Sequence, residues 1–155
     1  MELYKLELVA LIHELYDVPY TTAWNMWAAS SAVYSDRMYQ LMTYLMEHNN
    51  MYISIDRNPS INHGSYVTMR VVEISPDMTD YCMAIPPYIL PKSNADFDGD
   101  ILNIFCHKIG KIAEEYYIQS NPRSNMCVSH NDGNYDKETS LFKDAIVGLY
   151  AFLNC

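Results

Sequence analysis

Hydrophobic residues in the first fifty positions recur every three or four residues, the spacing that places them on one face of a helix. Two such stripes are present, the first at Leu8, Leu11, Ile12 and Leu15 and the second at Met38, Leu41, Met42 and Leu45. Pro19 interrupts the pattern, and Thr21 or Thr22 can cap a helix over residues 23–30. Ser35, followed by Asp36, can cap the next helix. This part of the chain therefore predicts three short helices.

The helical period is lost after Asn50. Segments rich in isoleucine, valine, tyrosine and threonine predict four strands, at residues 51–56, 65–75, 81–85 and 101–105. Three prolines exclude a regular helix after the third of these segments, namely Pro86, Pro87 and Pro91. The middle of the chain is therefore expected to be a β module.

Helical spacing returns over residues 108–119, and residues 121–138, rich in Asn, Ser and Gly, predict an exposed loop. A last helix, capped by Thr139 or Ser140, is expected to run through Leu153. The predicted fold class is therefore α+β, with a helical segment at 1–50, a β segment at 51–107 and a second helical segment at 108–155.

The chain has 155 residues, half of them hydrophobic, which is enough for one domain with an ordinary core. Its net charge of −9 has the wrong sign for a domain that holds nucleic acid by itself. Either the chain binds no nucleic acid, or other chains supply the positive surface. No run reaches the roughly 18 apolar residues of a membrane span, and we expect no membrane partner. The four cysteines show no CxxC pair and no zinc-site spacing, which predicts reduced, partly buried thiols in a cytoplasmic protein.

One segment concentrates the chemistry, because residues 94–100 read NADFDGD and carry three carboxylates at Asp96, Asp98 and Asp100. Charges this close repel one another unless a cation lies between them. Ligands that are all oxygen suit a hard divalent ion, and Mg²⁺ is favoured where few protein ligands leave room for waters and phosphates. The spacing excludes an EF-hand, because Ile101 and His107 stand where its glycine and its last acidic residue are required. An ordinary solvated acidic loop is the alternative.

The NADFDGD string resembles the signature of the largest, beta-prime-type subunit of multisubunit DNA-dependent RNA polymerases. The run Asp56-Arg57-Asn58-Pro59-Ser60-Ile61 is similar to the family's Asn-Arg-x-Pro-Ser/Thr-Leu motif, at about the family's distance upstream. Weaker similarity in the same order extends over most of the chain. Departures stand at Asp56, where the family has asparagine, at Asn62, where it has histidine, and at Ile101 and Phe105 after the aspartates. They indicate a divergent member, of the kind found in viral polymerases.

The resemblance implies a double-psi β-barrel within residues 51–107, with residues 94–100 as the catalytic loop. Asp96, Asp98 and Asp100 would hold the catalytic Mg²⁺, and a second Mg²⁺ would arrive with the ribonucleoside triphosphate for nucleotidyl transfer to the RNA 3′ end. The carboxylates would accept metal and would not transfer protons.

The resemblance also assigns Arg57 and Asn94 to the sugar hydroxyls, where they would help to select ribonucleotides. Ordinary alternatives are a surface salt bridge for Arg57 and a turn for Asn94. Gly99 is expected to adopt a φ that a side chain would resist, and Phe97 to point into the core and anchor the loop. His63 and His107 are expected to be ordinary surface or packing residues, with a contact to phosphate or nucleic acid as the alternative.

Nothing in the sequence resembles the family's bridge helix, trigger loop, clamp or zinc-binding segments, so we expect a product of a split gene or a piece of a longer chain. Its partners would be other polymerase subunits or segments, DNA template and RNA product, in the cytoplasm, or in the host cytoplasm if the source is viral. Two alternatives stay open. One is a non-catalytic metal-binding or structural remnant of a polymerase gene, and the other is a single-chain barrel polymerase with a similar aspartate loop.

Overall fold

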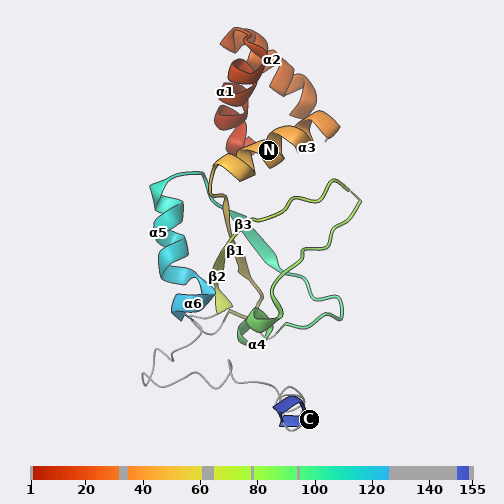
Figure 1. Cartoon of the computed structure of the whole chain (residues 1–155), viewed down its shortest axis with the longest axis vertical. Coiled ribbons are helices and arrows are strands. Elements are labelled where there is room, and N and C mark those ends of the chain that lie inside the picture. Colours follow the sequence, from red (N-terminus) through yellow and green to blue (C-terminus); the bar gives the residue numbers. More distant parts are fainter. Residues whose placement is uncertain are drawn as a thin grey trace.

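The computed structural model describes residues 2–31, 35–60, 65–77, 79–93, 95–125 and 150–153. It is an α+β structure in which three N-terminal helices lie at one end of a small antiparallel sheet (Figure 1). The helices α5 (Lys111–Ser120) and α6 (Pro122–Asn125) follow β3 (Asn103–Cys106), the last strand in the described residues. The division at residues 50/51 and 107/108 stays a prediction.

The first third of the chain forms three helices, as its periodicity predicts. They are α1 (Lys5–Tyr16), preceded by the 3₁₀ turn η1 (Glu2–Tyr4), α2 (Tyr20–Ser31) and α3 (Asp36–His48). Their apolar faces form one core, which includes Leu8, Ile12, Ala23, Trp27, Met38 and Leu41. The predicted cap of α3 is confirmed, because the Ser35 hydroxyl accepts a hydrogen bond from the Met38 N–H at 3.4 Å.

The start of α2 differs from the prediction. The Pro19 carbonyl accepts the Ala23 N–H at 2.9 Å, so the helix begins directly after the proline. Thr21 and Thr22 therefore lie inside the first turn, and the prediction that one of them caps the helix is wrong. Proline suits this position, because the first residues of a helix need no N–H donor for an intrahelical bond.

Three strands form a sheet in the order β2-β1-β3, with β1 (Tyr52–Asp56) between β2 (Val67–Arg70) and β3 (Asn103–Cys106). Both pairings are antiparallel, with Ser54 opposite Thr68 on one side and Phe105 on the other. Residues 81–85 form no strand, although their composition predicts one. Met83 and Ile85 pack against the hydrophobic core of Ile55, Val67 and Ile89 instead, so strand composition alone does not pair this segment with the sheet.

The segment after residue 85 is helical despite its prolines, so the expectation that they exclude a helix is wrong. It forms the 3₁₀ turn η3 (Pro87–Ile89) and the short helix α4 (Leu90–Ser93). Pro87 and Pro91 both fall in first turns, where the missing N–H leaves no hydrogen bond unmade. Ile89 is fully buried and packs with Ile55 and Val67 in a second core under the sheet.

The C-terminal part is described up to residue 125 and again at 150–153. The predicted helix at 108–119 is confirmed as α5, and its Tyr117 stacks on Tyr52 of β1 with ring centroids 4.8 Å apart. The predicted loop at 121–138 is wrong at its start, where α6 forms. Residues 150–153 are helical, as predicted for the end of the last helix, whose expected caps Thr139 and Ser140 lie outside the described residues.

Cys82 and Cys106 are free and exposed, which corrects the expectation of partly buried thiols, whereas Cys127 and Cys155 lie outside the described residues. His107 is a packing residue, as expected. Its Nε2 lies 2.6 Å from the Ser54 Oγ, and its ring stacks on Tyr116. Within the described ranges, no helix combines the length and the apolar character that a membrane span requires.

Candidate metal centre

The aspartate loop joins α4 to β3 and is fixed at both ends. On one side the Ala95 N–H donates to the Leu90 carbonyl at 3.1 Å, which closes the end of α4. On the other side Asn103 begins β3 and pairs with Asp56 at the end of β1. Leu102, one residue earlier, packs against the second core. The loop is therefore held between a helix end and a strand, while its middle stays at the surface.

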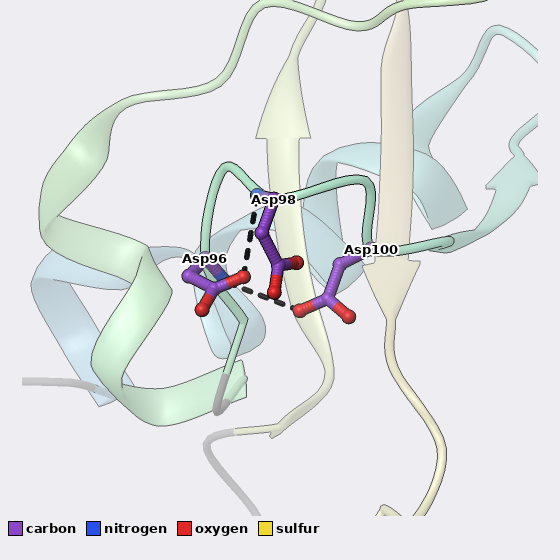
Figure 2. Close-up of side chains that lie close together, drawn as sticks. All are labelled: Asp96, Asp98 and Asp100. Atoms are coloured by element: carbon purple, nitrogen blue, oxygen red, sulfur yellow. Dashed lines mark hydrogen bonds between the residues drawn. The ribbon is translucent and has the colours of Figure 1, made fainter.

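Asp96, Asp98 and Asp100 turn their carboxylates toward one point (Figure 2). One oxygen from each residue lies within 4.8 Å of the others. Two backbone contacts shape the loop, since the Asp96 N–H donates to Asp100 Oδ2 at 3.1 Å and the Asp98 N–H donates to Asp96 Oδ1 at 3.3 Å. Alternate positions on a tight loop thus bring all three side chains together, as the sequence predicts.

Gly99 makes this turn possible. Its φ is +111°, in the region that residues with a side chain avoid, as the backbone argument predicts. A Cβ built at Gly99 would meet no atom within 4 Å, so the requirement for glycine comes from the backbone angle and not from crowding. Phe97 does not anchor the loop. It is 71% exposed, so the prediction that it points into the core is wrong, and Leu102 is the loop-side residue that packs against the second core.

The cluster shows the electrostatic strain expected of crowded carboxylates. A hydrogen bond shared with the Asp96 carboxyl group, followed by the negative charges of Asp96 and Asp100, raises the pKa of Asp98 above its usual range. A bound cation would relieve this repulsion.

The donor set fits Mg²⁺ in kind, since it offers three hard carboxylate oxygens and an open side for waters and phosphate. Neighbouring ligands of an octahedral Mg²⁺ lie about 3.0 Å apart, given bonds of about 2.1 Å. The present separation of up to 4.8 Å is wider, but Asp96 and Asp98 are exposed, and rotation of their side chains can close the gap.

Arg57 reaches the same cluster from the other motif. It follows the last residue of β1, and its Nη2 lies 2.8 Å from Asp100 Oδ1 in an ion pair that is largely shielded from solvent. The β1–β3 register brings the two together, because Asp56 and Asn103 are partners in the sheet. Arg57 therefore forms a salt bridge, which the sequence analysis names as its ordinary alternative, but nothing in the sequence indicates Asp100, 43 positions away, as the partner.

The remaining predicted residues divide into two groups. Asp56 is buried and accepts a hydrogen bond from the Ser60 hydroxyl within its own motif, so this departure from the family pattern has a structural role. Asn94 lies outside the described residues, as do Asn62 and His63. Comparison of the sequence with protein-family models and with curated proteins finds no match.

Proposed function

We propose that this chain is the active-centre segment of a divergent multisubunit DNA-dependent RNA polymerase, active only together with other polymerase subunits or segments. One observation carries the proposal. The two runs that resemble the polymerase family, at 56–61 and 94–100, meet in the Arg57–Asp100 ion pair beside three converging carboxylates. The β1–β3 register thus places the second motif, 43 positions away, beside the aspartate loop.

In this proposal Asp96, Asp98 and Asp100 hold Mg²⁺ as oxygen ligands and carry no proton during the reaction. Mg²⁺, when bound, lowers the pKa of the RNA 3′ hydroxyl and stabilises the charge that develops at the α-phosphate of the ribonucleoside triphosphate, with a second ion on the triphosphate. Gly99 keeps the three carboxylates turned toward one point. Arg57 and Asn94 hydrogen-bond the sugar hydroxyls.

The sheet β2-β1-β3 forms part of a double-psi β-barrel in this proposal. Template DNA and RNA product contact positive surface on the partner chains, which accounts for a net charge of −9 on this chain. The complex works in the cytoplasm, or in the host cytoplasm for a viral enzyme.

The test is purification of the tagged full chain from its native source, identification of its partners by mass spectrometry, and an assay of template-directed RNA synthesis. The proposal predicts partners that carry the other polymerase segments and Mg²⁺-dependent synthesis that Asp98→Ala abolishes. A complex in which Asp98→Ala polymerises as well as the original chain contradicts it. A chain without polymerase partners or activity would instead be a non-catalytic remnant.

A further inference from the structure

Arg57 and Asp100 form an ion pair whose place suggests more than a contact with substrate. We propose that the Arg57 guanidinium is a resident counter-ion of the aspartate cluster, which holds Asp100 while the cluster contains no metal and competes with a divalent cation for that carboxylate. This inference rests on the proposed function, because it assigns a form of regulation to the same site.

The contacts of the three aspartates are unequal. Within the described ranges, Asp100 is the one aspartate of the cluster that forms an ion pair, and its side chain is 19% exposed. The side chains of Asp96 and Asp98 are exposed. Both oxygens of Asp100 are engaged, Oδ1 by Arg57 at 2.8 Å and Oδ2 by the Asp96 N–H at 3.1 Å. A divalent cation that takes Asp100 as a ligand must therefore displace or share one of these contacts.

The position of Asp100 does not depend on Arg57 alone. The Asp96 N–H also binds Oδ2 of Asp100, and β3, which begins three residues later, is paired with β1. Loss of the arginine changes the charge at the site from a net of about −2 to about −3 when all three carboxylates are ionised.

The size of the effect follows from Coulomb's law. A single positive charge about 6 Å from a divalent cation weakens its binding about tenfold in a medium as polar as water. Screening at about 0.1 M salt reduces this factor to roughly threefold. The low solvent exposure of the Arg57–Asp100 pair weakens the screening and so increases the factor. Arg57→Gln is therefore expected to bind a divalent cation roughly three- to tenfold more tightly than the original chain.

The pairing also gives the site an order of events. While Arg57 holds Asp100, at least one of its donors is engaged, and that donor becomes available to a sugar hydroxyl only when a cation takes the carboxylate. Metal occupancy therefore changes how many of its donors Arg57 can offer to a sugar hydroxyl.

The experiment measures Mn²⁺ binding to the full chain by electron paramagnetic resonance of the free ion, with Mg²⁺ as competitor. Arg57→Gln should bind Mn²⁺ more tightly by the factor given above, and Arg57→Lys, which keeps the charge, should stay within about twofold of the original. Arg70→Gln is the matched control, because it removes one positive charge at the far end of β2 and should leave the affinity unchanged. Asp98→Asn should weaken binding at least tenfold.

The outcomes separate this inference from the proposed function. Saturable binding that depends on Asp98 but is unchanged or weaker in Arg57→Gln overturns the counter-ion role and leaves the metal site standing. Affinity in Arg57→Lys that rises as much as in Arg57→Gln also overturns it, because the charge would then be irrelevant. Absence of any Asp98-dependent binding at millimolar Mn²⁺ overturns the counter-ion role, whereas the proposed function is tested separately by RNA synthesis in the assembled complex. Urea unfolding of each variant checks that it is folded.

Discussion

A single hydroxyl links the three strands that bring Arg57 and the aspartate loop together, and its removal gives a sharp prediction. Ser54, in the middle of β1, is fully buried, and its Oγ lies 2.8 Å from Thr68 Oγ1 on β2 and 2.6 Å from His107 Nε2 beyond β3. Thr68 is equally buried, whereas His107 is partly exposed and can recover a hydrogen bond to water.

Ser54→Ala leaves the buried Thr68 hydroxyl without this partner, which costs about 1–3 kcal/mol, and we expect a loss of about 2 kcal/mol in the free energy of unfolding. Thr68→Val is milder, because Ser54 keeps His107, and we expect about 1 kcal/mol. The double variant removes both hydroxyls and leaves neither unpaired. Its loss should therefore fall short of the sum of the single losses by about 1 kcal/mol.

Urea unfolding followed by tryptophan fluorescence and circular dichroism measures these differences, and an unchanged slope against urea would show that only stability has changed. Ala10→Gly, in the middle of α1 on a separate core, is a control that should not couple to Ser54→Ala. Strict additivity of Ser54→Ala and Thr68→Val, or a Ser54→Ala loss below about 0.5 kcal/mol, would refute the shared-hydroxyl account.

Three further predictions concern the core, the loop and the response to pH. Ile89→Ala, at a fully buried position of the second core, should cost about 2–5 kcal/mol in urea unfolding. Gly99→Ala and Gly110→Ala should each lower the free energy of unfolding by about 1–2 kcal/mol, because alanine is strained at the positive φ of both positions. Only the change at Gly99 should weaken Mn²⁺ binding. Burial raises the pKa of Tyr4 to about 12 from its ordinary value of 10. Tyr4 therefore ionises at lower pH in the unfolded chain than in the folded chain, so its contribution to the free energy of unfolding is complete below pH 10 and is lost as the pH rises from 10 to 12. In an ultraviolet titration, Tyr4→Phe should lack the last tyrosine step of the original chain.

The features that the sequence predicts well are local ones. The three N-terminal helices follow from the spacing of apolar residues, and the cap at Ser35 follows from a hydroxyl placed before an acidic first turn. The convergence of the three aspartates is also a local feature, because the turn at Gly99 brings side chains at alternate positions to the same side of the loop. In each case residues within about one turn of each other determine the result.

The features that the sequence does not predict depend on distant neighbours. Residues 81–85 have the composition of a strand, but Met83 and Ile85 pack beside the sheet without joining it, and Phe97 is exposed on the loop. The Arg57–Asp100 pair requires the β1–β3 register, which neither motif contains. The helical turns at Pro87 and Pro91 show that a proline excludes helix only after its first turn.

The central claim is that the three aspartates are the catalytic metal ligands of an RNA polymerase. It is tested most directly by the rate of ribonucleotide incorporation in the assembled complex, with Asp98→Asn compared with Asp77→Asn. Both changes remove one exposed negative charge, but Asp77 only caps a local turn through Thr79. Loss of a residue that only hydrogen-bonds a metal ligand already lowers metal affinity or activity about 10- to 100-fold. Asp98→Asn should therefore lower the rate of incorporation at least about a hundredfold, and Asp77→Asn should leave it unchanged. Equal rates for the two variants would contradict the account.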